Sequence, residues 1–214
     1  MTIDEGTIRE KLKAASPVTE NNFRHYAVLV PLIRKEDGIH VLYEVRAEDM
    51  DRQPGEICFP GGEVEEGESF ARCALREAEE EIALPQDRVE ILEELTTIYG
   101  VGRFAMHCFP GFIDGGVLDE LEPSDAEVGR IFTVSLDDLM AAEVEMYRAR
   151  LIQEGPEDFP YERVTGGKDY PWSRVTSPVP VIEVDGWAIW GLTGRVTKVL
   201  LEALKRGAEE ALKK

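Results

Sequence analysis

The spacing of apolar positions changes along the chain, and each spacing predicts a different element. Residues 25–34 (HYAVLVPLIR) are almost continuously apolar, which is typical of a central strand. Residues 39–46 (IHVLYEVR) alternate after a Lys-Glu-Asp-Gly turn, so the two runs predict a β-hairpin. Because Pro110 has no N–H to donate, the strand around it is expected at a sheet edge or at a bulge. Further strands are predicted over 56–59, 89–99, 106–113, 127–134 and 179–184.

Helical spacing appears between and after these runs. A short N-terminal helix is predicted over 4–15, and Ser135 has the chemistry of an N-cap for a helix that ends near 142. Residues 187–212 are predicted to form mostly a C-terminal helix, whereas 145–175 have no clear period. We expect this segment to be a long excursion over the surface.

The length and charge of the chain restrict its class. A chain of 214 residues suits a single domain, here with its core at about 25–142. The order of strands and helices predicts an α/β domain with a mixed β-sheet between helices. The net charge of −19 argues against nucleic acid or an anionic membrane as the main partner, since both require a basic surface. The sequence leaves the oligomeric state open, a homodimer included.

The cysteines and the hydropathy favour a cytoplasmic protein. An odd count of three cysteines without metal-ligand spacing is typical of small buried side chains in a reducing cytosol: Cys58, Cys73 and Cys108. No apolar run reaches membrane-spanning length, and the first residues lack the apolar core of a signal peptide. Structural roles are expected for the three histidines, His25, His40 and His107.

The stretch from Gly61 to Leu84 concentrates acidic residues on a predicted helix. At 100° per residue, Glu77, Glu80 and Glu81 share an arc of about 100° within about two turns. Like charges at i and i+4 repel each other, but a hard divalent cation would convert them into a ligand set. The alternative is an ordinary solvated face of an acidic protein. An apolar stripe lies beside the arc and is made by Ala71, Ala74, Leu75, Ala78 and Ile82.

A longer pattern distinguishes between these alternatives. From Gly62 the sequence runs through five residues to Glu68, then through seven to Arg-Glu-Ala-Glu-Glu-Glu at 76–81. This resembles the Nudix box, and the resemblance implies an α/β/α sandwich and a divalent-metal hydrolase of nucleoside diphosphate derivatives. Ala83 stands where the family usually has glycine, and Ala78 is small for a usually larger aliphatic site. Neither departure removes a ligand.

Metal ions can supply most of the chemistry of diphosphate hydrolysis, and the expected cofactor is Mg²⁺ or Mn²⁺. Glu77 and Glu81, at i and i+4, are the first candidate ligands. Glu80 is the next, either as a ligand or as the acceptor of the proton from the attacking water. Gly61 is a further candidate through its carbonyl oxygen, since no side chain blocks the approach.

Three residues outside this set are assigned by resemblance. Arg76 is expected to pair with a carboxylate and orient it, its alternative being a surface ion pair. Glu68 is expected to bond within the loop or reach a metal, although an acid at a helix N-terminus is common. Glu127 resembles the later acid that serves relatives as ligand or base, and its alternative is a glutamate at a strand edge.

The segments around the box point to a substrate. Residues 55–62 (GEICFPGG) and 190–193 (WGLT) resemble the coenzyme A diphosphatase branch, whose members split CoA and acyl-CoA into 3′,5′-ADP and (acyl)phosphopantetheine. In the leader of that branch Arg46 is kept, whereas Glu44 stands near an expected threonine. Asp51 falls near an expected arginine, with Arg52 adjacent. The candidates for binding substrate phosphates are therefore Arg46 and Arg52, together with Lys168 further along the chain.

Two other functions stay open at this point. One is a Nudix enzyme acting on ADP-ribose, a dinucleoside polyphosphate or a nucleotide sugar. The other is an inactive Nudix fold that senses a nucleotide or binds a partner, which the intact acids at 77, 80 and 81 disfavour.

Overall fold

The structure is a computed structural model that describes residues 5, 13, 23–172 and 174–211. The helix predicted over 4–15 lies almost entirely outside these residues and stays a prediction. Within the described part no helix has the length and apolar character needed to cross a membrane.

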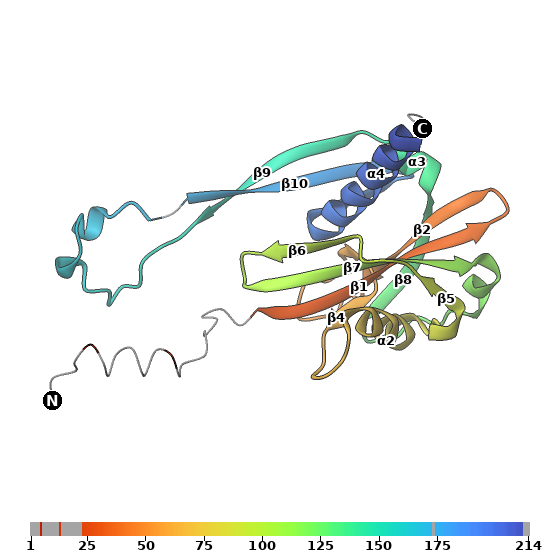
Figure 1. The fold of residues 1–214 in the computed structure, drawn as a ribbon, viewed down its shortest axis with the longest axis horizontal. Coiled ribbons are helices and arrows are strands. Elements are labelled where there is room, and N and C mark those ends of the chain that lie inside the picture. The colour runs from red at the N-terminus through yellow and green to blue at the C-terminus, as the bar shows by residue number, and fades with distance from the viewer. Residues whose placement is uncertain (1–4, 6–12, 14–22, 173, 212–214) are drawn as a thin grey trace.

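An eight-stranded mixed sheet forms the centre of the body (Figure 1). Its main order is β3-β2-β1-β7-β5, with β4 also paired to β1, β6 to β7 and β8 to β2. Only the pairing of β1 with β7 is parallel among the described pairs. The strands are β1 (Arg24–Lys35), β2 (Gly38–Arg46), β3 (Ile57–Cys58), β4 (Gly61–Glu63), β5 (Val89–Ile91), β6 (Thr96–Gly100), β7 (Phe104–Asp114) and β8 (Val128–Ser135).

The predicted hairpin is confirmed as β1 and β2, which pair from Leu32 opposite Val41 to Lys35 opposite Gly38. Gly38 adopts a φ of 130°, which glycine tolerates better than other residues. β1 is buried along most of its length because it lies inside the sheet and helices cover both faces. This explains why its sequence is continuously apolar.

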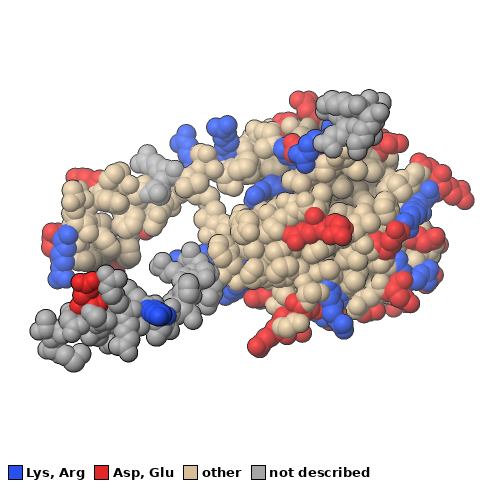
Figure 2. Space-filling view, viewed as in Figure 1, with Lys and Arg blue, Asp and Glu red and all other residues tan. Residues whose placement is uncertain are grey.

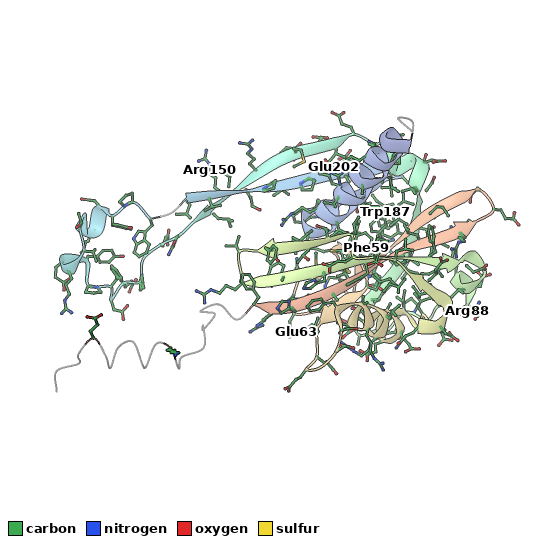
Figure 3. All side chains as sticks on the ribbon, in the orientation of Figure 1. Phe59, Glu63, Arg88, Arg150, Trp187 and Glu202 are labelled. Atoms are coloured by element: carbon green, nitrogen blue, oxygen red, sulfur yellow. The ribbon has the colours of Figure 1, made fainter. Side chains whose placement is uncertain are left out.

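Helices cover the two faces of the sheet, as the sandwich architecture requires (Figure 1). Because strand side chains alternate, β1 sends Ala27 and Leu29 towards α2 (Phe70–Ile82) and Val28 and Val30 towards α4 (Gly191–Ala211). Phe59 and Trp187 lie in the layer between the sheet and α4 (Figure 3). The remaining helices are short: η1 (Gln86–Arg88), η2 (Gly115–Glu120), α3 (Leu136–Ala141), η3 (Tyr161–Arg163) and η4 (Gly167–Asp169).

The ends of two helices differ from the expectations. α2 begins after Ser69, whose hydroxyl accepts a hydrogen bond from the N–H of Arg72 at 3.3 Å. It ends at Ala83, which adopts the left-handed conformation with φ of 55°, so alanine occupies a position that favours glycine. Ser135 is the N-cap residue of α3, and the predicted helix is confirmed at Leu136–Ala141, but the side chain of Ser135 makes no capping hydrogen bond.

The strands around Pro110 correct two predictions. Residues 89–99 form two strands, β5 and β6, separated by a break at 92–95. β7 lies between β1 and these strands, so Pro110 is not on an edge strand. The residue falls at the break, where the N–H of Leu92 donates to the carbonyl of Pro110 at 2.8 Å. The missing N–H of the proline is tolerated because the neighbouring ladder is interrupted there.

The segment after α3 is not an irregular excursion over the surface. β9 (Val144–Ile152) and β10 (Arg174–Val184) form an antiparallel ribbon that projects away from the body (Figure 1). β11 (Trp187–Trp190) pairs with the base of β10, so the C-terminal helix begins at Gly191 and not at 187. The far end of the ribbon is held by edge-to-face contacts among Phe159, Tyr161, Tyr170 and Trp172.

Candidate metal centre and substrate cavity

A cavity of about 770 Å³ opens where β4, α2, the end of β2 and the start of α4 meet. One part of its wall is acidic, with Glu63, Glu77, Glu81 and Glu127. Three arginines lie on the same wall, Arg24, Arg46 and Arg52. The apolar part is formed mainly by Met50, Ile57, Phe59, Phe104, Met106, Trp190, Leu192 and Val196.

Two glycines bring β4 close to its neighbours at this cavity. β4 pairs with β1, with Gly61 opposite Val28 and Gly62 opposite Ala27. A Cβ atom on Gly61 would overlap the carbonyl oxygen of Ala27, and one on Gly62 would overlap the carboxylate of Glu77. Glycine is therefore required for the backbone and this carboxylate to approach each other.

Glu81 is the most buried acid of the cavity wall, with 7% of its surface exposed. The N–H of Gly61 donates to its Oε2 at 2.8 Å. Burial raises the pKa of Glu81 to about 8, the Gly61 N–H opposes the rise, and the carboxylates of Glu77 and Glu127 add to it. Burial also raises the pKa of Glu77, against the effect of Arg76. Both carboxylates would be stabilised in their ionised form by a cation.

Arg76 connects three acids on the outer side of this group. Its guanidinium donates to Glu68 through Nε and Nη2, each at 3.1 Å. It also donates to Glu77 at 2.8 Å and to Glu80 at 3.1 Å. The bond from Arg76 lowers the pKa of Glu68. The planar fork thus fixes the Glu77 carboxylate from the side opposite the cavity.

Loop contacts bring Glu127 to the acid group. The N–H of Ser124 donates to the carbonyl of Glu81 at 2.7 Å, and that of Glu122 to the carbonyl of Ile82 at 3.2 Å. The loop before β8 is therefore attached to the C-terminal end of α2. The N–H of Ala47 donates to the carbonyl of Glu127 at 2.9 Å, which fixes this residue beside the end of β2.

The end of β2 and the loop that follows it bring Arg46 and Arg52 to the cavity. The pairing of β2 with β8 is irregular between Val45 and Arg46. Beyond it, the chain folds back so that the N–H of Arg46 donates to Glu56 and the N–H of Gly55 donates to Arg46. The Nε of Arg46 donates to the carbonyl oxygen of Arg52 at 3.3 Å. One loop thus brings both cations to the cavity that the acids line.

The structure therefore brings together six of the residues singled out in the sequence: Gly61, Glu77, Glu81, Glu127, Arg46 and Arg52. It does not bring Glu80 or Glu68 to the cavity, because the side chain of Glu80 is 59% exposed and both carboxylates bond Arg76. His25 and His107 hydrogen-bond each other at 3.1 Å and do not line the cavity.

Glu44 was noted in the sequence only as a departure from the leader of the coenzyme A branch, and it was given no role there. It is 1% exposed, and burial raises its pKa well above the usual value, with a further contribution from Glu81. The signal was present, because alternation in β2 places Glu44 on the same buried face as Leu42. An acid at an inward position of a strand is unusual enough to indicate a function.

The donor set fits a hard divalent cation. Carboxylate oxygens and the backbone at Gly61 are the ligands that Mg²⁺ or Mn²⁺ prefers. Within the described residues, no group of three or more acidic, histidine or cysteine side chains is already arranged to hold an ion. The acids line one cavity but do not meet at one point. The site therefore suits an ion that keeps several of its waters better than an ion that is coordinated by protein atoms alone.

Comparisons with known proteins agree with this geometry. The model of the NUDIX domain matches residues 23–155. The peroxisomal coenzyme A diphosphatase NUDT7 of Mus musculus is 30% identical over 162 residues, which cover 73% of this chain and 67% of that protein. An uncharacterised Nudix hydrolase NudL of Enterobacter sp. (strain 638) is 36% identical over 120 residues, covering 56% of this chain and 61% of that protein. The matches thus span about two thirds of these relatives or less.

A solved structure supports the fold. The MutT/nudix family protein from Enterococcus faecalis superposes with a TM-score of 0.52 at 13% identity, covering 96% of this chain and 70% of that one. At this identity the likeness concerns the fold alone. The NUDIX domain model matches residues 23–155, and this range includes Gly61, Gly62 and the acids of α2. The chain therefore belongs to the Nudix family of pyrophosphohydrolases.

Proposed function

We propose that the protein hydrolyses the diphosphate linkage of coenzyme A or acyl-CoA to 3′,5′-ADP and (acyl)phosphopantetheine, with Mg²⁺ or Mn²⁺. The observation that carries the proposal is the lining of one cavity, which combines acids, the buried Glu81 among them, with arginines. The acids suit a cation and the arginines suit phosphate oxygens. The diphosphatase named among the relatives supports the choice of CoA.

In this proposal Glu77, Glu81 and the backbone of Gly61 hold the metal, which when bound supplies charge neutralisation and an acidified water. Arg76 keeps Glu77 in place through its bidentate contact with Glu68. Arg46 and Arg52, which line the same cavity, hold the phosphates. Glu127 lines the cavity and Glu80 does not, so we assign acceptance of the water's proton to Glu127.

The apolar part of the cavity supports a substrate with a long uncharged portion. Trp190, the last residue of β11, and Leu192, in the first turn of α4, line the same cavity as Phe104 and Met106 of β7. Such a wall suits the pantetheine arm of CoA, whereas ADP-ribose would place a polar terminal ribose there. The departures at Glu44 and Asp51 make ADP-ribose the competitor to test.

Product analysis tests the proposal. The purified protein is incubated with Mn²⁺ and, separately, with CoA, acetyl-CoA, ADP-ribose and diadenosine polyphosphates, and the nucleotides are separated. We expect 3′,5′-ADP from CoA and acetyl-CoA and slow turnover of the others. Release of AMP from ADP-ribose while CoA stays intact would overturn the choice of CoA as the substrate. If no compound gives more product than it does with a Glu81→Gln control, the inactive fold would be favoured.

A further inference from the structure

A buried carboxylate lies behind the cavity wall with almost no partner. Glu44 of β2 is 1% exposed, and its Oε1 has no hydrogen-bond partner among the described residues. Its Oε2 accepts only from the thiol of Cys58, with a donor–acceptor distance of 3.7 Å. A thiol is a weak donor, so this contact offsets little of the cost of removing a carboxylate from water.

The charges around Glu44 belong to the candidate metal centre. Glu81 and Glu127, both on the cavity wall, act on it as like charges, and Arg46 acts as the opposite charge. Cys58, its hydrogen-bond donor, is its cross-strand partner on β3 and also lines the cavity. Glu44 therefore stands behind the wall that carries the ligand candidates, on the protein side of Glu81.

We propose that Glu44 is a further anionic residue of the metal centre, which acts from behind Glu81 to increase the affinity of the cavity for a divalent cation. It is a positioning residue, because it does not line the cavity and acts through Glu81 and Arg46. This inference rests on the metal-binding part of the proposed function.

A purely structural role explains the observations less well. An inward position next to Leu42 would be filled by an apolar side chain if packing alone mattered, since a buried carboxylate without a cation is destabilising. Arg46 offsets part of the charge, but its Nε is used by the carbonyl of Arg52. A divalent cation at Glu77 and Glu81 would supply the missing positive charge, so the cation and Glu44 would stabilise each other.

The test measures cation binding without substrate. Mn²⁺ affinity is determined by isothermal titration calorimetry for the wild-type protein and for Glu44→Gln, which keeps the shape and removes the charge. We expect about tenfold weaker binding or more in the variant. The melting temperature without metal should be at least as high as that of the wild type, and the increase that Mn²⁺ gives should be smaller.

Glu79→Gln is the matched control, because Glu79 is exposed on the outer side of α2, where its carboxylate accepts a hydrogen bond from Gln86. It removes the same charge from the same region, and its Mn²⁺ affinity should stay within about twofold of wild type owing to solvent screening. An equal loss in Glu79→Gln and Glu44→Gln would overturn the proposal, since net charge alone would then explain it.

Two further results would overturn it. Unchanged Mn²⁺ affinity in Glu44→Gln would leave Glu44 as a structural acid while the metal-dependent function stands. No Mn²⁺ binding by the wild type would remove both this proposal and the metal-dependent mechanism. If Glu44→Gln does not fold, Glu44→Thr replaces it, since threonine is the residue expected there in the coenzyme A branch, and the same loss of affinity is expected.

Discussion

Charged side chains lie in opposite surroundings on helix α2 and on the ribbon of β9 and β10. On α2, Glu81 is buried and Arg76 is largely enclosed by the acids that it joins. On β9, Arg148 and Arg150 are exposed on a ribbon that stands clear of the body (Figures 1 and 2). Figure 3 shows Arg150 projecting from this ribbon. Residues of the same chemical kind thus meet two different dielectric environments.

The difference explains where chemistry can occur. Near water, a pair of charges interacts weakly and is screened by salt, as expected for the ribbon. Between α2 and the sheet, burial raises the pKa of Glu77 and Glu81, and a cation binding there interacts strongly with them. We infer that the body carries the reaction and that the ribbon beyond its base contributes little to it.

The largest expected effect follows from removing an acid of the cavity. Glu77→Gln and Glu81→Gln should each lower the turnover of CoA by roughly two orders of magnitude or more, in the range seen for lost electrostatic groups. Steady-state rates with Mn²⁺ in excess measure this, with Glu79→Gln as the control. Rates close to wild type in both variants would show that the metal centre lies elsewhere.

A smaller effect is expected when the charge is kept and the fork is lost. Arg76→Lys retains the positive charge but cannot bond Glu68 in a bidentate manner while reaching Glu77. We expect about tenfold lower turnover, because the Glu77 carboxylate loses its fixed orientation. Substrate and metal titrations check it, since higher Mn²⁺ should restore part of the rate. Full activity at all Mn²⁺ concentrations would mean that Arg76 is only a surface ion pair.

The pH dependence of stability should distinguish the buried acids from the exposed charges. A carboxyl group whose pKa is raised by folding stabilises the native state below its unfolded pKa, and this contribution is lost as pH rises through the native pKa. For Glu81 this stabilisation is lost between pH 4.5 and about pH 8, because folding raises its pKa over that range. We therefore expect the melting temperature of the metal-free protein to fall across this range.

Calorimetry in a chelator measures that fall, and Mn²⁺ should raise the melting temperature most at the upper end, where the ligands are ionised. Glu81→Gln should flatten the metal-free curve relative to wild type. The comparison separates the effect of Glu81 from the general repulsion in a protein of net charge −19. Identical curves for the two proteins would contradict the raised pKa.

The smallest effect is expected from shortening the ribbon. Arg148 and Pro178 are cross-strand partners, so replacing residues 149–177 by Asn-Gly closes the ribbon near its base. Because no described residue of this segment lines the cavity, turnover should stay within about twofold of wild type. A loss of tenfold or more, with an unchanged melting temperature, would show that the ribbon takes part in substrate binding.

The same contrast determines how much of the molecule could be predicted from sequence. The hairpin of β1 and β2 was predicted because β1, covered on both faces, has a continuous apolar run, and α2 because it buries one face, which leaves a helical period in the sequence. The ribbon was missed because most of β9 is exposed, so it has no alternation of polarity to reveal a strand. β11 was merged with α4, since its apolar run WAIW can precede a helix without interruption.

The site was predictable to the extent that it depends on local spacing. Helical geometry placed Glu77 and Glu81 together, but it could not decide which edge of the arc faces the sheet, and Glu80 lies on the exposed side. The pairing of Glu44 with Cys58 depends on contacts between β2 and β3. Its inward position was readable from the alternation of β2, yet its neighbours were not.

The most direct test of the central claim is the release of 3′,5′-ADP from CoA while Mn²⁺ is titrated into the wild-type protein and into Glu81→Gln. The proposed mechanism predicts release that depends on Mn²⁺ in the wild type and falls by roughly two orders of magnitude in the variant. Release without Mn²⁺ in a chelator, equal release by the two proteins, or no release by the wild type at any Mn²⁺ concentration would contradict it.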